Sequence, residues 1–402
     1  MLSTLLLGAA ITVQLHRFPV PSDGFWSAVT AASDGRIYIG LCKHGGDGHL
    51  LVFDPRGGQM RTLGSMPDVT HERNLGRQPQ SKIHTKIQEG ADGRIYFATH
   101  RGNWWFHARA HEPGSYPGGH WLAYDPRTDR FEDMGRFRPE LGGIVTLTMD
   151  RKRALMYGMT ASTGHLLKFD VKTGRGVDLG RLANWDTIVR SLVLDREGRL
   201  YGSTDPNRIF RYDPDSDRLE FLPVEIPHRE GLEPSPVTST TTKRMWRVAI
   251  LSRDEKKIYG IHAGSVDLFE FDPASLKIRK LAQMCPDEYL DSPRVPYATL
   301  ALAEGLDGIL YYAAVGGARR FDYYDTEGAS PEGARAHLIT YDPATGRRTD
   351  HGQLRGPNGE FVLGVEGATT APDGTIYFVG LVASPKETGI RLLVFNPKEI
   401  KK

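Results

Sequence analysis

The chain has 402 residues, with 51 basic and 49 acidic side chains and a formal net charge of +2 at pH 7. This near balance produces no strong field for a polyanion, so we expect no nucleic-acid partner. No apolar run reaches the length of a membrane span, and two cysteines do not indicate a disulfide framework.

The first residues of the chain are apolar and precede a short strand-like run. Residues 1–12 contain no basic residue and are short for a signal peptide. They are either a leader or an extension of the run that follows, from Val13 to Pro19. The apolar character favours a secreted or periplasmic location without defining a signal peptide.

One phrase then recurs seven times along the chain. It consists of a turn, a strand with a central tyrosine, a second strand that ends near Phe/Tyr-Asp-Pro, and a polar tail. The first two copies read DGRIYIG with HLLVFDP, and DGRIYFA with HWLAYDP. A strand-rich period of about fifty residues is typical of a β-propeller. The repeated tyrosines are Tyr38, Tyr96, Tyr157, Tyr201, Tyr259, Tyr311 and Tyr377.

Each copy contains four short runs rich in Ile, Tyr, Phe and Val, bounded by Asp-Gly or Asp-Pro turns. In the second copy these runs are KIHTKIQEG, RIYFATH, HWLAYDP and RFEDMG. We therefore predict an all-β fold, a single domain over 1–402 that forms a seven-bladed β-propeller with four-stranded blades. The last copy ends near Pro397 without a fourth strand, so the run from Val13 to Pro19 is predicted to complete blade seven and close the ring.

The repeat separates scaffold positions from candidate site positions. A residue type that recurs at one place in the unit is expected to be structural. One such place, at the start of the third strand, holds a histidine in four copies and a polar residue in all seven, which favours a structural hydrogen bond. Among the four histidines at this place, His120 alone gains a second interpretation, from the unusual loop before it. The four histidines are His49, His120, His165 and His337.

His84 and His100 occur at places where no other copy has histidine. His84 lies at the entrance of the innermost strand of copy two, and His100 ends the second strand. These two places open on the same face near the propeller axis, so the two side chains are expected to approach each other there. A hydrogen-bonded pair that steadies a long loop is the alternative. The residues equivalent to His84 are Trp26, Val145, Val189, Arg247, Thr299 and Val365.

Two loops between the second and third strands break the short-loop rule. They run from Arg101 to Gly119 and from Gly316 to Arg335, and such long loops are typically functional or disordered. The aromatic residues of the first loop form either a sugar-stacking platform or a hydrophobic plug. The connection before copy two, with Arg73 and Asn74, is expected on the same rim.

The stretch KIHTKIQEGADGRIYFATHRG, followed by YPGGHWLAYDP, resembles the seven-bladed polysaccharide lyases. These are the ulvan lyases and the lyases and related glycosidases that act on rhamnose–glucuronic acid linkages. The resemblance implies β-elimination next to a uronate by a histidine pair near the axis, with a tyrosine and an arginine nearby. His100 and His120 bracket the copy-two loop as such a pair does. Candidates for the tyrosine and the arginine are Tyr116, Tyr297, Arg190 and Arg247.

These considerations define two groups of candidate residues on the rim. A cation or a neutral donor must offset the substrate carboxylate, and Arg247 and His84 are candidates for this role. A neutral histidine can take the proton, and a tyrosine can protonate the leaving oxygen. The candidate catalytic residues are His84, His100, His120, Tyr116 and Arg247. The candidate substrate contacts are Arg73, Asn74, Arg101, Trp104, Trp105, Arg190 and Tyr297.

Three classes of function remain open. The first is a carbohydrate-active enzyme, in the first place a lyase on a uronate-containing glycan, with a glycosidase on the same scaffold as a variant. The second is a non-catalytic propeller that binds a sugar or a protein. The third is a metal-dependent enzyme in which His71, His84, His100 and His107 hold a cation, but their spacing matches no compact ligand motif. We predict no metal or other cofactor, a glycan or oligosaccharide partner, and a monomer.

Overall fold

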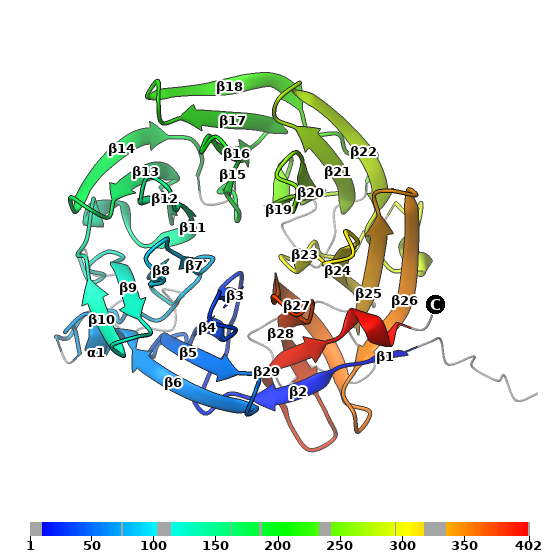
Figure 1. Ribbon diagram of the computed structural model, residues 1–402, viewed down its shortest axis with the longest axis horizontal. Coiled ribbons are helices and arrows are strands. Elements are labelled where there is room, and N and C mark those ends of the chain that lie inside the picture. The colour runs from blue at the N-terminus through cyan, green and yellow to red at the C-terminus, as the bar shows by residue number, and fades with distance from the viewer. Residues whose placement is uncertain are drawn as a thin grey trace, which may run out of the picture.

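Antiparallel sheets surround a central axis in this protein, as in a β-propeller (Figure 1). The structure, a computed structural model, describes residues 10–73, 75–102, 114–161, 163–184, 187–232, 243–293, 295–316 and 335–400. Within these ranges the helices are α1 (Met66–Val69) and 3-10 turns at Pro139–Leu141, Asp287–Tyr289 and Pro397–Glu399. The prediction of an all-β propeller is confirmed.

Five of the sheets have four strands each. The first contains β3 (Val29–Ala31), β4 (Ile37–Leu41), β5 (His49–Asp54) and β6 (Gln59–Ser65). The second contains β7 (Gln88–Glu89), β8 (Ile95–Ala98), β9 (Trp121–Asp125) and β10 (Arg130–Asp133). The third contains β11 (Ile144–Asp150), β12 (Leu155–Thr160), β13 (His165–Asp170) and β14 (Arg175–Arg181). The fourth contains β15 (Val193–Leu194), β16 (Leu200–Thr204), β17 (Arg208–Asp213) and β18 (Arg218–Glu225). The fifth contains β19 (Trp246–Leu251), β20 (Ile258–His262), β21 (Asp267–Asp272) and β22 (Lys277–Gln283).

The remaining sheet has nine strands and brings the two ends of the chain together. Its β26 and β27 are joined through a single residue pair, Arg355 with Phe361. At one end β2 pairs antiparallel with β29, and β1 pairs parallel with β26. The strands are β1 (Ala10–Thr12), β2 (Gln14–Arg17), β23 (Leu302–Glu304), β24 (Leu310–Gly316), β25 (Arg335–Asp342), β26 (Arg347–Arg355), β27 (Phe361–Thr370), β28 (Ile376–Ala383) and β29 (Thr388–Phe395).

The repeated tyrosine closes the Asp-Gly turn that precedes it. The hydroxyl of Tyr38 donates a hydrogen bond to Asp34 at 2.9 Å, and that of Tyr96 donates to Asp92 at 2.8 Å. The glycine of the first turn, Gly35, has φ of +82°, a conformation that costs glycine little. The same bond joins Tyr201 to Asp195 at 3.0 Å and Tyr311 to Asp307 at 2.7 Å, whereas the buried hydroxyl of Tyr157 has no partner among the described residues. The feature that all seven copies share is the buried tyrosine ring.

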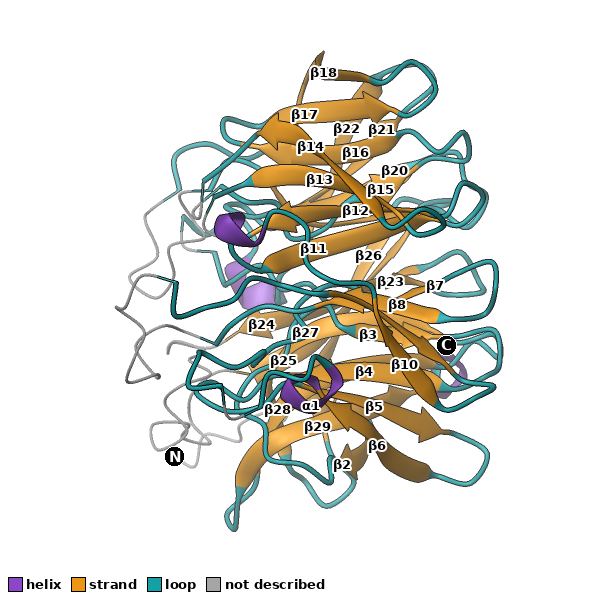
Figure 2. Ribbon diagram, turned by 90° about the vertical axis from the view of Figure 1, so that its left-hand side faces the viewer, coloured by secondary structure: helices purple, strands orange, loops and turns teal. Residues whose placement is uncertain are grey.

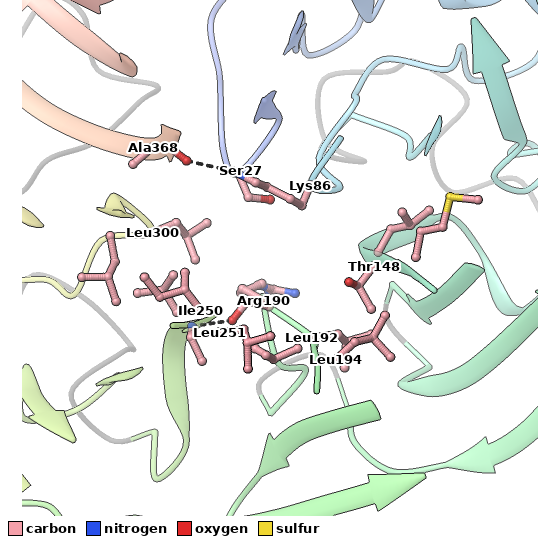
Figure 3. A pocket seen from close by; sticks show the side chains of 17 residues that line it. Ser27, Lys86, Thr148, Arg190, Leu192, Leu194, Ile250, Leu251, Leu300 and Ala368 are labelled. Atoms are coloured by element: carbon pink, nitrogen blue, oxygen red, sulfur yellow. Dashed lines mark hydrogen bonds between the residues drawn. The ribbon is translucent and has the colours of Figure 1, made fainter. Parts of the chain in front are cut away.

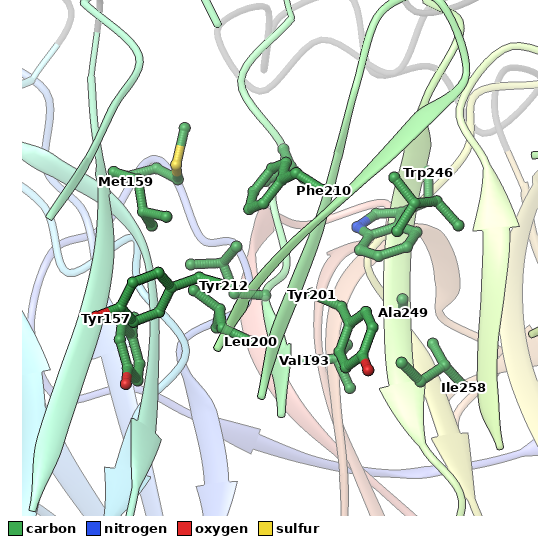
Figure 4. Close-up of a cluster of buried hydrophobic side chains, with 14 of the residues drawn as sticks. Tyr157, Met159, Val193, Leu200, Tyr201, Phe210, Tyr212, Trp246, Ala249 and Ile258 are labelled. Atoms are coloured by element: carbon green, nitrogen blue, oxygen red, sulfur yellow. The ribbon is translucent and has the colours of Figure 1, made fainter. Parts of the chain in front are cut away.

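The core lies between neighbouring sheets. Aromatic side chains fill the space between the third, fourth and fifth sheets, as Figure 4 shows for Tyr157, Tyr201, Phe210 and Trp246. All four are fully buried, and burying a large apolar side chain contributes roughly 1.5–3 kcal/mol relative to leaving it in water. This packing leaves the innermost strands to line the axis.

The propeller has two faces, which Figure 2 shows from the side. Because the strands alternate in direction, the Asp-Gly turns lie on one face, and the entrances of the innermost strands lie on the other together with the ends of the second strands. We call the latter the entrance face. Among the described residues there is no helix with both the length and the apolar character needed to cross a membrane.

Candidate site on the entrance face

Isolated β-bridges place Lys82 and His100 side by side at the entrance of the second sheet. Cys42 pairs with Lys82, and Lys82 pairs with His100. The amide of Lys82 donates to the carbonyl of His100 at 2.9 Å, and the amide of His100 donates back at 3.0 Å. His84 follows two residues later and precedes β7. His84 and His100 therefore lie on the same face, in the arrangement that the strand path predicts.

The hydrogen bond of His84 fixes which ring nitrogen carries its proton. Nδ1 lies 2.8 Å from the carbonyl oxygen of Val145 on β11. A carbonyl only accepts, so Nδ1 is the donor and Nε2 of the neutral ring carries the lone pair. The ring also stacks on Trp26, with centroids 4.7 Å apart. His84 is thus held between the first and third sheets in a form that can accept a proton.

Burial and neighbouring cations keep both histidines neutral. Desolvation lowers the pKa of His84 well below its ordinary value, and Arg190 and Lys82 lower it further. Desolvation likewise lowers the pKa of His100 well below the ordinary value, helped by Lys82 and Arg101. Burial lowers the pKa of Lys82 itself to about 8. An uncharged imidazole pair surrounded by cations suits a negatively charged ligand, and each neutral ring has one nitrogen with a lone pair.

A second charged group faces the axis from the fifth and last sheets. Arg247 Nη2 donates to Glu366 Oε1 at 3.0 Å and to the hydroxyl of Tyr297, and Arg247 Nε donates to the carbonyl of Ala298 at 3.0 Å. Glu366 is fully buried, and its other oxygen accepts from the amide of Leu300 at 2.9 Å. Burial raises the pKa of Tyr297 well above its ordinary value, so the phenol stays protonated.

A largely apolar pocket between the sheets has Arg190 in its lining. Its volume is about 280 Å³. Figure 3 shows Arg190 and Lys86 among aliphatic side chains around the axis. Lys86 Nζ donates to the carbonyls of Val29 and Ala368, both at 2.8 Å, and burial lowers its pKa to about 8. The aliphatic lining includes Leu147, Leu192, Leu194, Val248, Leu300 and Leu302.

His120 and Tyr116 belong to a different hydrogen-bonded network. His120 Nδ1 lies 2.9 Å from Asp133, and its Nε2 lies 3.1 Å from Glu72. Gln80 Nε2 donates to Glu72 at 2.8 Å, and the hydroxyl of Tyr116 donates to Gln80 Oε1 at 2.8 Å. The predicted pairing of His120 with His100 across the copy-two loop is therefore not what organises these side chains.

The contact between His120 and Asp133 is a feature of the repeat. His165 meets Asp178 at 3.1 Å, and His337 meets Asp350 at 3.1 Å, in each case thirteen residues along the chain. These hydrogen bonds tie the third strand to the fourth. The structural interpretation of the repeated histidine thus accounts for His120 as well, and its two carboxylate partners raise its pKa against the effect of burial.

The residues predicted to contact a substrate have different surroundings in the structure. Arg73 binds Asp47 at 2.6 Å and also Asp68, so two carboxylates engage its guanidinium. Arg101 lies near His100 on one side and near Tyr116 on the other, because its charge lowers the pKa of each. For Tyr116 this partly offsets the rise that burial causes. A pocket of about 400 Å³ is lined by Arg101 and Tyr116. Asn74, Trp104, Trp105 and His107 lie outside the described residues.

Sequence reasoning missed three side chains of this site. Lys82 precedes His84 by two residues, and this closeness to a candidate histidine near the propeller axis could have identified it as a site residue from the sequence. Glu366 is the only acidic residue in the otherwise apolar and small run FVLGVEGATT of β27, and an ionisable group in a buried strand points to a function or a buried partner. Trp26 was identified only as the residue equivalent to His84, and its stacking on that ring follows from the structure.

No family model matches the chain, and no curated protein sequence matches it significantly. Among solved structures it is similar to a β-propeller chain in the crystal structure of a mitotic checkpoint complex, with 10% identity and a TM-score of 0.58. That alignment covers 97% of this chain and 94% of the other. A chain of the Kuenenia stuttgartiensis hydrazine synthase aligns with 13% identity and a TM-score of 0.49, over 77% of each chain. At these identities the first likeness shows the propeller fold alone.

Proposed function

We propose that the protein binds a uronate-containing glycan on the entrance face and cleaves it as a lyase, by β-elimination. The observation that carries this proposal is the pair of buried, neutral histidines, His84 and His100, surrounded by the cations Lys82 and Arg190. Elimination next to a carboxylate needs a base and a group that offsets the carboxylate charge, because that charge must be neutralised before a weak base can remove the neighbouring proton.

The reaction has two proton transfers and one bond cleavage. A histidine takes the proton from the carbon beside the carboxylate, and the electron pair of that C–H bond forms a C=C bond. The bond between the β-carbon and the glycosidic oxygen breaks, and the leaving oxygen takes a proton. His84 is the favoured base, because its Nε2 has the free lone pair while Nδ1 is held by Val145.

Arg190 and Lys82 are assigned to the carboxylate, and Tyr297 to the leaving oxygen. The charge of Arg247 is already compensated by Glu366 at 3.0 Å, so this arginine positions the Tyr297 phenol and does not itself neutralise the substrate. The raised pKa of Tyr297 keeps a proton available at neutral pH. This assignment replaces the role of carboxylate neutraliser that the sequence suggested for Arg247.

The test is to incubate the protein with rhamnose–glucuronate glycans, ulvan and other uronate polymers while recording the ultraviolet absorbance of an unsaturated product. Wild type is expected to produce the absorbance with at least one polymer, and His84→Ala to lose roughly a hundredfold or more in rate. Reducing ends that appear without the absorbance would indicate a glycosidase. Neither signal with any uronate polymer would count against an enzyme of this class.

A binding propeller without catalysis is the second candidate. The observation that favours it is burial: His84 and His100 are only 5% and 4% exposed, which leaves little surface for a reacting atom. In that case the same cations would bind the carboxylates of an acidic glycan. Calorimetric binding of a uronate polymer, with no product over the same period, would support this reading and contradict the lyase.

We also infer that the ring has seven blades. The nine-stranded sheet divides into two four-stranded groups when the single β26–β27 residue pair is taken as a link between neighbours. One group is then β27, β28, β29 and β2, and β1 adds an outer strand to the other. The antiparallel pairing of β2 with β29 supports ring closure by the N-terminal run.

A further inference from the structure

Nitrogen, oxygen and sulfur donors converge beside the first sheet. Asp23, Cys42 and His44 each place one potential ligand atom within 4.8 Å of the others. Asp23 Oδ1 lies 2.9 Å from His44 Nδ1, and Cys42 Sγ lies 3.7 Å from the same nitrogen. Cys42 and His44 are buried, whereas the side chain of Asp23 is 25% exposed.

The backbone fixes the positions of these three side chains. The amide of Asp23 donates to the carbonyl of Cys42, and the amide of Cys42 donates to the carbonyl of Gly24, both at 3.0 Å. Asp23 Oδ1 accepts from the amide of His44 at 2.8 Å, and Lys43 Nζ binds the second carboxylate oxygen at 2.9 Å. The carboxylate is therefore held with Oδ1 toward the imidazole by its contacts with the His44 amide and Lys43.

We propose that Asp23, Cys42 and His44 form a binding site for a divalent transition-metal ion, with Zn²⁺ as the preferred ion. Zn–S bonds of about 2.3 Å and Zn–N bonds of about 2.0 Å separate sulfur and nitrogen ligands by about 3.5 Å at a tetrahedral angle. The observed separation of Cys42 Sγ and His44 Nδ1 is 3.7 Å. Mixed nitrogen, oxygen and sulfur donors suit this ion. Three protein ligands leave the fourth position for water, and the exposure of Asp23 gives that position a route to solvent.

The thiol of this group is not explained by the repeat. Cys42 stands four residues after Tyr38, and His100 stands at the same place in the second copy. Packing of the sheet does not require sulfur at this place, because the other copies differ in size and polarity. The equivalent residues are Ala161, Asp205, Ala263, Val315 and Leu381.

The metal site adjoins the candidate site on the entrance face without sharing its residues. His44 meets Trp26 edge-on with centroids 5.8 Å apart, and Cys42 forms a β-bridge with Lys82. An ion bound here braces the segment that carries Trp26, on which His84 stacks. Binding forms a metal–sulfur and a metal–nitrogen bond. The Cys42 thiol proton is released to water, and the His44 proton that Nδ1 donates to Asp23 moves to Nε2, so affinity falls as the pH is lowered. The site does not depend on the proposed lyase activity.

Cobalt titration of the purified full-length chain tests this site. Co²⁺ bound to a thiolate gives a sulfur-to-metal charge-transfer band in the near ultraviolet. We expect this band to saturate at about one Co²⁺ per chain and to disappear when Zn²⁺ is added. Cys42→Ser is expected to abolish the band. Cys285→Ser is the matched control, because Cys285 is also free and buried but lies outside the donor group, and it is expected to retain the band.

A second variant keeps the test independent of folding. Asp23→Asn preserves the shape of a partly exposed side chain and is expected to weaken Co²⁺ binding at least about tenfold. Circular dichroism of each variant reports whether the β-sheet signal is retained. Absence of the band in wild type, its persistence in Cys42→Ser, or unchanged Co²⁺ affinity in Asp23→Asn would each overturn the proposal.

Discussion

The imidazole of His84 stacks on the indole of Trp26, with centroids 4.7 Å apart and planes 21° from parallel. The two residues occupy the same place in neighbouring copies of the repeat. The same indole meets Lys82 Nζ at 4.3 Å and His44 edge-on at 5.8 Å. One aromatic side chain thus orients a candidate base, a candidate anion-binding cation and a candidate metal ligand.

Trp26→Leu is expected to lower stability by more than the lost apolar contact alone. A cation over an indole contributes about 0.5–2 kcal/mol, depending on how far it is desolvated. A double-mutant cycle with Lys82→Met, measured by urea unfolding, is expected to give a coupling free energy in that range. Additive effects of the two substitutions would show that the Lys82–Trp26 contact contributes nothing to stability.

The neutral histidines make stability depend on pH. Burial lowers the pKa of His84 and His100 in the folded state, so their contribution is fully present above the ordinary value of 6.5. As the pH falls below 6.5, the unfolded chain binds protons that the folded chain does not, and stability is lost. We expect the urea midpoint to fall between pH 7 and pH 5, and the fall to be smaller in a His84→Gln, His100→Gln double variant.

Protonation of His120 stabilises the folded protein, whereas protonation of His84 or His100 destabilises it, so His120 serves as the internal control. Its folded-state pKa is raised by Asp133 and Glu72 against the effect of burial. Its contribution is therefore present below pH 6.5 and lost as the pH rises through the folded value. His120→Gln is expected to steepen the fall of stability toward acid pH. An unchanged profile in both variants would contradict these protonation states.

The ion pair of Arg247 and Glu366 is expected to matter more for stability than any exposed pair. Both side chains are buried, and the atoms are 3.0 Å apart. Glu366→Gln leaves the Arg247 charge uncompensated, which costs about 3–5 kcal/mol. The control is Arg17→Gln, which breaks an exposed pair with Glu387 and should cost less than about 1 kcal/mol. Equal midpoints in thermal unfolding would show that the buried pair is solvated.

The repeat predicted the scaffold well because each copy contains the turn residues and the strand residues of one four-stranded sheet. Tyr38 and Asp34 make the same hydrogen bond in the first copy as Tyr96 and Asp92 make in the second. A single short strand is difficult to recognise in a sequence, but seven occurrences of the same pattern identify the strands reliably. The strand path also indicated that His84 and His100 share a face, since that follows from alternation alone.

The partners of the site residues could not be predicted in the same way. Whether Arg247 is available to a substrate depends on Glu366, which lies 119 residues away along the chain. Arg73 likewise is engaged by Asp47. Such contacts join side chains that stand in single copies of the repeat, so the shared pattern gives no information about which of them meet. Residue type and position in the repeat predicted that the candidate residues lie on the entrance face. Which of their charges are already paired is visible only in the structure.

Removal of residues through Pro19 tests ring closure. It deletes β2, whose antiparallel pairing covers β29, and exposes an unpaired edge. We expect insolubility or loss of cooperative unfolding, measured by expression yield and calorimetry. Removal of only residues 1–9 leaves both β1 and β2 and is expected to be tolerated. A soluble, cooperatively folding chain that begins after Pro19 would show that the N-terminal strands do not close the ring.

The contrast between His100→Ala and His165→Ala separates chemistry from scaffold. His100 occupies a place where no other copy has histidine, and cations surround it. As the histidine beside the favoured base His84, it is expected to be needed for turnover of a uronate polymer, which its loss should lower roughly a hundredfold or more with the fold intact. His165 makes the repeated contact with Asp178 at 3.1 Å, so its loss is expected to cost roughly 1 kcal/mol of stability and little activity.

Product absorbance and the urea midpoint are both measured for each variant, because a loss of activity in one variant alone could be explained by misfolding. A large loss of turnover in His100→Ala with an unchanged midpoint, beside a lowered midpoint and retained turnover in His165→Ala, is the expected pattern. Equal and small effects on turnover from both would favour the binding propeller. Normal stability of His165→Ala would show that recurrence of a histidine in the repeat does not identify a structural contact, and the assignment of His120 to the scaffold would then lose its support.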